Sequence, residues 1–474
     1  MTSPAEPQPR IPGILHLAWP LVVSFALRAA FTWVDRIYAA YLPDPDVAQA
    51  AIGLAQPIEF LLIACWVGSS NGLTSRLAAA MGAREGARVE QLKRASLRLI
   101  WSLVVLFVLI AAAIWFSAPR LGLEANLARG FQVYGVALIG GSALTGFWAI
   151  LPDSLVKAHQ DTRTTMWAGI ISSVVNVAFN TLFVFVFHWG LFGIGLSTAI
   201  GRLGGLAYSI WKAGQHERAR VGAGRDTAPG LYDRPIRALL TIAIPSGLTY
   251  VLMAAEGFAV NGILANSHTS SGATGAALKA IQADALAAWS VFGAAVSFLA
   301  MPAIAVGVAM LPLAARLGGA AEGGRLRSEL RTALLAWAGF GLLVVVPLGL
   351  FGWPWLTDVL LESEQAIQFA ARARWILPLV VLVLGPFMIT RPLFDAMAAS
   401  RTGLLLSCLR SLGLIVPCTF AGGLIAVAMG ASEMGGMLAG NGLGVAGGTT
   451  IALVSALRLV RTKVPPQGDR AEAS

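Results

Sequence analysis

Charged residues and cysteines are scarce in this sequence. Only 12% of its 474 residues are Asp, Glu, Lys or Arg, whereas a soluble protein carries about 25%. A soluble fold is therefore excluded, because a chain of this length would need a charged surface around several domains. The three cysteines show no CxxC spacing and the five histidines no HExxH motif. Neither a disulfide framework nor a metal site is expected.

Signals of ATP use and of enzyme chemistry based on His or Cys clusters are also missing. The dipeptide Gly-Lys does not occur, and without it the chain lacks the phosphate-binding loop of an ATP-driven pump. The His and Cys residues do not cluster as they would around a reactive group. We therefore expect no enzyme, no primary transport by this chain and no cofactor.

Apolar residues, in contrast, are abundant. They make up 57% of the chain, and 52 residues are Gly, as expected where helices pack closely in lipid through small side chains. Between the charge clusters, the apolar segments are long enough to cross a bilayer as helices. The pattern predicts an all-α polytopic membrane protein with twelve transmembrane helices. The predicted spans are 13–41, 52–80, 96–117, 131–156, 165–188, 191–212, 237–264, 277–313, 331–356, 371–398, 403–427 and 435–460.

Basic residues lie mostly on one side of these spans. That side holds, among others, Arg84, Arg88 and Arg218, while the opposite loops hold Arg120 and Arg129. By the positive-inside rule, we expect a multi-pass protein of the plasma (inner) membrane with both termini in the cytoplasm. The net charge of +10 is then a topology signal, so no nucleic-acid partner is expected.

The chain divides near its middle at a polar loop rich in Gly and Arg. The segments 17–20 and 82–88 before it reappear weakly as 242–245 and 319–325 after it. Because each half has six spans, the two six-helix lobes should be related by a pseudo-twofold axis along the membrane normal, with a cavity between them. The expected parts are an N-terminal tail 1–12, an N-lobe 13–212, a linker 213–236, a C-lobe 237–460 and a C-terminal tail 461–474.

Four segments resemble one transporter family. They are 20–35 in the first span, the Gly-Ala-Arg-Glu-Gly-Ala-Arg junction 82–88 with its repeat, the Asn176 and Asn180 helix followed by the Gly-Ile-Gly-Leu-Ser-Thr run 193–198, and Met301-Pro302. In this order they are similar to the multidrug and toxic compound extrusion (MATE) transporters over about 13–460. The resemblance implies a cation-coupled antiporter that exports amphipathic, often cationic compounds, with two lobes opening alternately to either side of the membrane.

Asp35 is the first candidate for the coupling residue. An ionisable side chain inside a span is costly in hydrocarbon and is a functional candidate by default. Burial favours its protonated form, whereas a bound Na⁺ or organic cation favours the charged form, so one carboxylate can exchange ions. The position also matches the first-helix aspartate of the family. An ion pair with Arg36 or Arg28 is the alternative interpretation.

Span five carries a polar stripe. Ser173, Asn176 and Asn180 recur at helical spacing on an otherwise apolar helix, so this face must meet protein or water. Thr198 on the sixth span is expected to complete a site with them, with Arg202 one turn further in. The alternative is a set of hydrogen bonds that only holds the lobe together. Within the resemblance, Asn180 stands where many members have an aspartate, which removes one titratable group.

Glu256 in span seven is the second candidate carboxylate. It has no basic residue three or four positions away, so another helix, a proton or a cation must stabilise it. It resembles the span-seven glutamate of one MATE subgroup. A permanently protonated, hydrogen-bonding glutamic acid is the alternative.

Other polar residues in the spans rank lower, namely Tyr38, Glu59, Asp284 and Asp395. Asp395 and Arg391 form a pair four residues apart, and Asp153 and Lys157 form another at the equivalent place in the first half. Both pairs are interpreted as mainly structural.

The function best supported by these patterns is secondary active antiport of drugs or xenobiotics against H⁺ or Na⁺ by a rocker-switch mechanism. A flippase for a lipid-linked oligosaccharide, or an exporter of a single metabolite from the same superfamily, is the alternative; Arg28 and Arg202 could then meet a pyrophosphate. Expected partners are the lipid bilayer and small organic cations or amphipathic compounds, and the protein is expected to be a monomer. The sequence does not distinguish H⁺ from Na⁺, because an aspartate with amide and hydroxyl neighbours suits either.

Overall fold

The computed structural model describes residues 12–224, 230–267, 272–361 and 363–463, with side chains except at 26–33, 46 and 463. Within these residues the secondary structure is helical throughout, as the apolar runs predict. Eleven helical segments are long and apolar enough to cross a membrane, and α1, of 26 residues, is the twelfth. The prediction of an all-α polytopic membrane protein is confirmed.

The first six segments form one lobe. Its helices are α1 (Ile14–Ala39), α2 (Pro45–Gly82), α3 (Gly86–Ser117) with η1 (Ala118–Arg120), then α4 (Ala125–Gly135), η2 (Val136–Gly140), α5 (Gly141–Gly146), η3 (Phe147–Ala149) and α6 (Ile150–Ala158) in one span, α7 (Thr162–Thr181) with η4 (Leu182–Val186), and α8 (Gly190–Gly222). Helix α8 continues past residue 212, where the predicted span ends, because ion pairs stabilise its charged last turns outside the apolar region.

The second six segments form the other lobe. Its helices are α9 (Pro235–Ala265), α10 (Gly275–Gly319), α11 (Gly323–Phe340) followed by η6 (Gly341–Val345), η7 (Leu348–Gly352) and α12 (Trp353–Leu360), the short α13 (Glu364–Ala371), α14 (Ile376–Ala396), α15 (Ser400–Cys408) with η8 (Leu409–Ile415) and α16 (Val416–Ala428), and α17 (Glu433–Lys463). Since α14 begins at Ile376, Arg372 and Arg374 lie before it and join Arg120 and Arg129 on the less basic side.

The two lobes meet through α1 and α2 on one side and α9 and α10 on the other. Glycine allows the backbones to touch there. A Cβ at Gly319 would lie 2.2 Å from the carbonyl oxygen of Ala79, and one at Gly68 would lie 2.4 Å from that of Ala243. Such close approach of small residues is how helices pack without a hydrophobic driving force between them.

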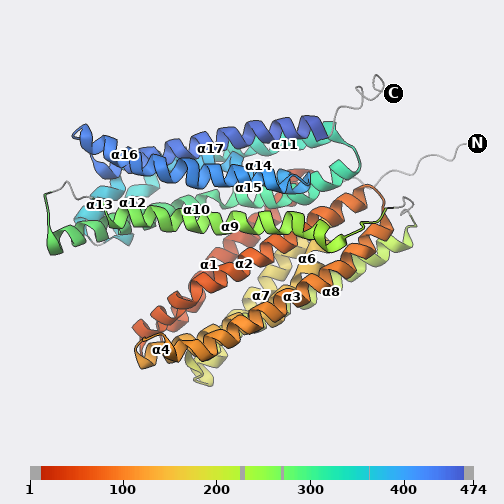
Figure 1. Cartoon of the computed structure of the whole chain (residues 1–474), viewed down its shortest axis with the longest axis horizontal. Helices are drawn as coiled ribbons and strands as arrows, with labels where there is room; N and C mark the ends of the chain where they lie inside the picture. The colour runs from red at the N-terminus through yellow and green to blue at the C-terminus, as the bar shows by residue number, and fades with distance from the viewer. Residues whose placement is uncertain (1–11, 225–229, 268–271, 362, 464–474) are drawn as a thin grey trace, which may run out of the picture.

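These contacts are concentrated toward one end of the molecule. Figure 1 shows the lobe of α1 to α8 and the lobe of α9 to α17 converging toward the end where both chain termini lie and separating toward the other end. Two hydrogen bonds support this arrangement: Asn71 on α2 donates to Ser246 on α9, and Ser75 donates to the backbone oxygen of Asp395 on α14. The two lobes are therefore joined at the end of the molecule where the chain termini lie.

Candidate functional site

Asp35 lies near the end of α1, half-buried, and accepts hydrogen bonds from two other helices. Oγ1 of Thr198 on α8 donates to Oδ2 across 3.1 Å, and Nδ2 of Asn180 on α7 donates to Oδ1 across 3.3 Å. Among the described side chains, Asp35 forms no ion pair, so Arg36 does not neutralise it. The side chain of Arg28, the other alternative partner, lies outside the described residues.

Asn176 closes this arrangement into a network. Its Nδ2 donates to Oγ1 of Thr198 across 3.1 Å, and its Oδ1 accepts from Nδ2 of Asn180 across 3.4 Å. The structure thus brings together Asp35, Asn176, Asn180 and Thr198, four of the five residues predicted to form the site.

The donors around Asp35 are all neutral. Neutral hydrogen bonds orient a carboxylate but leave its negative charge uncompensated, and a buried charge needs a partner. Asn180 is completely buried, and its Oδ1 has no hydrogen-bond partner among the described residues. The network therefore offers carboxylate, amide and hydroxyl oxygens, the ligand types that suit a proton or a hard cation such as Na⁺. The described residues contain no group of three or more His, Cys, Asp or Glu that could hold a metal ion.

Close packing of α7 against α8 places these side chains. A Cβ at Gly201 would lie 2.7 Å from the carbonyl oxygen of Ser172 and 2.8 Å from Cβ of Asn176. Since any side chain at position 201 would push the helices apart, this glycine is what allows Thr198, three residues earlier on α8, to contact Asn176.

Tyr38 lies close to the network without bonding to Asp35. Its hydroxyl hydrogen-bonds with Oγ1 of Thr181 across 2.6 Å and donates to the carbonyl oxygen of Val177 across 3.4 Å. Tyr38 therefore holds the last turn of α1 against α7, three residues beyond the carboxylate. This contact fixes the position of Asp35 rather than adding a ligand.

Glu59 on α2 pairs with Arg202 on α8 across 3.5 Å. Both charges of this pair act electrostatically on Asp35, and they oppose one another there. Asp284, also of lower rank, is half-buried on α10 and is not part of the network.

The two predicted pairs at the inner ends of the spans are present. Nζ of Lys157 lies 2.6 Å from Oδ2 of Asp153, and Nη1 of Arg391 lies 2.9 Å from Oδ2 of Asp395. Arg391 also donates to Thr249 on α9 across 2.8 Å. Each carboxylate has its cation one helical turn away, as in a structural pair.

Glu256 is stabilised by another helix, one of the three possibilities that its sequence surroundings left open. Nη1 of Arg410, in η8, lies 3.5 Å from its Oε2. Arg410 is a residue that sequence reasoning missed. The signal was a single arginine inside the apolar span 403–427, where a basic side chain is as costly as an acidic one.

Helix α2 contains a residue spacing that is typical of one class of enzymes. Residues 68–72 read Gly-Ser-Ser-Asn-Gly, the GxSxG spacing that in α/β-hydrolases forms a strand-to-helix turn around a nucleophilic serine. Here it lies within α2, and Gly68 and Gly72 face the backbone of α9. The spacing therefore serves helix packing.

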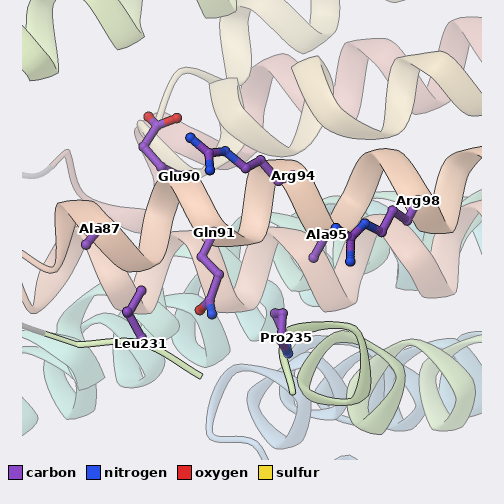
Figure 2. A pocket seen from close by; sticks show the side chains of 8 residues that line it. All are labelled: Ala87, Glu90, Gln91, Arg94, Ala95, Arg98, Leu231 and Pro235. Carbon is purple, nitrogen blue, oxygen red and sulfur yellow. The ribbon is translucent and has the colours of Figure 1, made fainter. Parts of the chain in front are cut away.

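A pocket of about 400 Å³ lies at the end of the molecule where the lobes meet. Figure 2 shows lining residues along α3, with Leu231 opposite Ala87 and Gln91, and with Pro235, at the start of α9, opposite Ala95. Gln91 fixes the segment that enters α9: its Nε2 donates to the backbone oxygen of Tyr232 across 2.7 Å, and its Oε1 accepts from the backbone nitrogen of Tyr232 across 2.8 Å. The pocket is separate from the Asp35 network, which lies near the last turn of α1, away from the end of the molecule where the lobes meet.

Glu217 joins several helices at the same end. This carboxylate on α8 pairs with Lys93 on α3 across 3.1 Å, with His159 after α6 across 2.9 Å, and with Arg220 across 2.9 Å. Burial lowers the pKa of His159, against the opposing effect of Glu217.

Asp161 caps the first turn of α7 beside this group. It accepts a hydrogen bond from the backbone nitrogen of Thr164 across 3.1 Å and pairs with His216 across 2.8 Å. Burial raises the pKa of Asp161, but the hydrogen bonds from His216 and Thr164 outweigh that effect and hold the pKa at about 2. Asp161 is therefore charged at neutral pH.

Comparison with known proteins places this chain in a family. The MatE family model matches residues 20–182 and 269–421. The chain is 28% identical over 219 residues to a probable multidrug resistance protein NorM of Acinetobacter baylyi, covering 44% of this chain and 47% of that one. It is 22% identical over 363 residues to a probable multidrug resistance protein YoeA of Bacillus subtilis, covering 73% and 72%. The chain spans about half the length of the first curated relatives it matches.

Solved structures share the fold. The bent form of the Vibrio cholerae MATE transporter VcmN superposes with a TM-score of 0.80 at 21% identity, covering 95% of this chain and 97% of that chain. A MOP superfamily transporter from Pyrococcus furiosus superposes with a TM-score of 0.78 at 18% identity, covering 95% and 96%. Because the family model covers more than half of the chain, the chain belongs to the multidrug and toxic compound extrusion family, whose members are transporters and not enzymes.

Proposed function

We propose that this protein is a secondary active antiporter that exports amphipathic, often cationic compounds in exchange for H⁺ or Na⁺. The observation that carries the proposal is the setting of Asp35: a half-buried carboxylate held by the neutral donors Asn180 and Thr198, with no ion pair among the described residues. A carboxylate in such a setting needs a proton or cation, and can release it when the setting changes.

The arrangement of the lobes suits alternating access. They are joined at the end of the termini and separate toward the other end (Figure 1). With the termini in the cytoplasm, as the positive-inside rule expects, this is an outward-facing state. Binding of an external H⁺ or Na⁺ at Asp35, supported by Asn176, Asn180 and Thr198, then favours substrate release outside. A ligand shifts the equilibrium between the two states only through its different affinity for each.

The remaining parts of the proposal follow from the family and from the chain's own charge pattern. Two relatives carry the description of a probable multidrug resistance protein, which supports drugs or xenobiotics as substrates. We place the protein in the plasma (inner) membrane as a monomer, since one chain supplies both lobes and the whole Asp35 network. The cycle is a rocker-switch movement of the two lobes.

The test compares efflux of a fluorescent cation, ethidium, in wild type and Asp35→Asn under separately imposed H⁺ and Na⁺ gradients. We expect gradient-driven efflux in wild type, at least ten-fold loss in Asp35→Asn, and no loss in the control Asp358→Asn, which removes an exposed carboxylate of α12. The gradient that drives efflux identifies the ion.

The alternative is decided by the same experiment. If folded wild-type protein moves no organic cation under either gradient, the flippase or single-metabolite exporter becomes the better interpretation. The structure weakens that alternative, because Arg202, one of the two arginines it would use, is paired with Glu59.

A further inference from the structure

The C-lobe contains a counterpart of the Asp35 network, built from the corresponding helices. In the internal repeat, the residue that matches Asp35 is Val260, and Glu256 lies one helical turn before it. The residue that matches Asn180, the donor to Asp35, is Cys418, and Arg410 lies about two turns before it on the same helix, from where its longer side chain reaches Glu256. In both lobes, therefore, a carboxylate on the first helix faces a hydrogen-bond donor on the fifth. The donor is a neutral amide in the N-lobe and a guanidinium in the C-lobe.

Arg410 occupies a site built for it. It is 3% exposed, and its guanidinium lies over the ring of Phe387 on α14, with 4.5 Å to the ring centroid. On α17, a Cβ at Gly448 would lie 2.5 Å from Cγ of Arg410, so glycine is needed to leave space for the arginine stem. The residue lies in the π-helical segment η8, and such segments often occur at functional sites.

The charge balance of the two lobes differs as a result. In the C-lobe, Arg410 compensates the charge of Glu256, whereas the neutral donors of the N-lobe leave the charge of Asp35 uncompensated. Removing Arg410 would leave Glu256 uncompensated as well. Nη1 of Arg410 donates to Glu256 across 3.5 Å and to Ser411 across 3.3 Å, while Nε has no partner among the described residues. A second cation brought to Glu256 would be repelled by the guanidinium already there.

We propose that Arg410 is a tethered cation, which permanently takes the place at Glu256 that a coupling H⁺ or Na⁺ would otherwise occupy, so that ion exchange is confined to Asp35. The inference rests on the proposed antiport function and deepens it, because it sets which lobe carries the coupling ion. It also makes Arg410 the residue that prevents the C-lobe from becoming a second monovalent-cation site.

The first experiment measures binding and needs no transport. Purified full-length protein without substrate is titrated with ²²Na⁺, and its proton uptake is measured separately between pH 8 and pH 5. We expect Arg410→Met to bind about one more monovalent cation per protein than wild type. Arg410→Lys, which keeps a tethered cation, and Glu256→Gln/Arg410→Met, which removes both charges, should bind the same number as wild type. Equal binding by Arg410→Met and wild type would overturn the proposal.

Arg410→Gln is the second neutral variant, to be used if Arg410→Met does not fold; it must show the same additional cation. The second experiment counts ions moved per ethidium in proteoliposomes. The ratio should rise in Arg410→Met and equal the wild-type ratio in Glu256→Gln/Arg410→Met. A lower ratio in the double variant would assign coupling to Glu256 and refute the tether.

Failure of the proposed antiport function can be distinguished from failure of the proposed role of Arg410. If Asp35→Asn transports and binds cations like wild type, the proposed function of Asp35 is wrong, while the binding difference between Arg410→Met and Arg410→Lys still decides the role of Arg410.

Discussion

Asn180 donates a hydrogen bond to Asp35 across 3.3 Å, while its own side-chain oxygen has no partner among the described residues. The carboxylate of Asp35 thus orients this amide, because it accepts a hydrogen bond from the NH₂ group and would repel the amide oxygen. Asn180 stabilises the charged form of Asp35 without neutralising it.

The substitution Asn180→Asp would place a second carboxylate at hydrogen-bond distance from the first. Two like charges this close do not both stay ionised without a cation between them. We expect the purified protein to bind about one more proton or Na⁺ than wild type, measured by ²²Na⁺ binding and by proton uptake. Asn180→Ala, which removes the donor without adding charge, is the control and should gain none. Equal binding by Asn180→Asp and wild type would contradict this role for the position.

Gly319→Ala tests the contact between the lobes. The new Cβ would lie 2.2 Å from the carbonyl oxygen of Ala79, so backbone must move, and overpacking of this kind costs about 1–3 kcal/mol. We expect a lower thermal unfolding midpoint and greater accessibility of single cysteines placed along the inner half of α2. Gly339→Ala, where nothing lies within 4 Å of the new Cβ, is the matched control. Unchanged stability and accessibility in Gly319→Ala would show that the helices are not in contact there.

Asp161→Asn tests how the ion pair of Asp161 with His216 contributes to stability at different pH values. Because the pKa of folded Asp161 is about 2 and the unfolded value is about 3.9, the charged form stabilises the fold above about pH 4. This contribution disappears as pH falls toward 2. Asparagine can still cap α7, so the substitution isolates the charge.

We expect Asp161→Asn to lower the free energy of unfolding by about 1–2 kcal/mol at pH 7, with the difference from wild type shrinking below about pH 4. Thermal unfolding of both proteins between pH 7 and pH 3 is the measurement. A difference that stays constant over this range would assign the effect to packing instead of charge.

Gln91→Ala tests how the segment between the lobes is held. The substitution removes both hydrogen bonds to the backbone of Tyr232. The Tyr232 amide should then exchange its hydrogen about ten-fold faster, the equivalent of losing about 1.4 kcal/mol of protection. Tyr232→Phe keeps both backbone bonds and should exchange at the wild-type rate. Equal protection in Gln91→Ala and wild type would mean that another contact holds the segment.

The architecture and part of the site were predictable from sequence because they depend on local patterns. Apolar length locates the spans, and the spacing of Asn176 and Asn180 puts both on one face of α7, the face that meets Asp35 and Thr198. The end of α8 was predicted ten residues early, since hydropathy falls at residue 213 while the helix continues to Gly222. Charged turns outside lipid are stabilised by pairing, which hydropathy does not measure.

The pairing of Glu256 with Arg410 was not predictable in the same way. The two residues lie 154 positions apart, and spacing on a single helix says nothing about contacts between helices. The sequence surroundings of Glu256 left another helix, a proton or a cation open as its partner, and the structure places a side chain of another helix beside it. Including basic as well as acidic residues in the search of the spans would have found Arg410, but not its partner.

The contacts of Glu217 determine how the N-lobe can move. One carboxylate bonds to α3, to the turn between α6 and α7 and to its own helix α8, so these helix ends cannot separate from each other without breaking several charged hydrogen bonds. In the proposed rocker-switch cycle, we therefore expect these ends of α3, α6, α7 and α8 to move together. The proposed cycle then places the bending elsewhere, in the segments that connect these helices to the C-lobe.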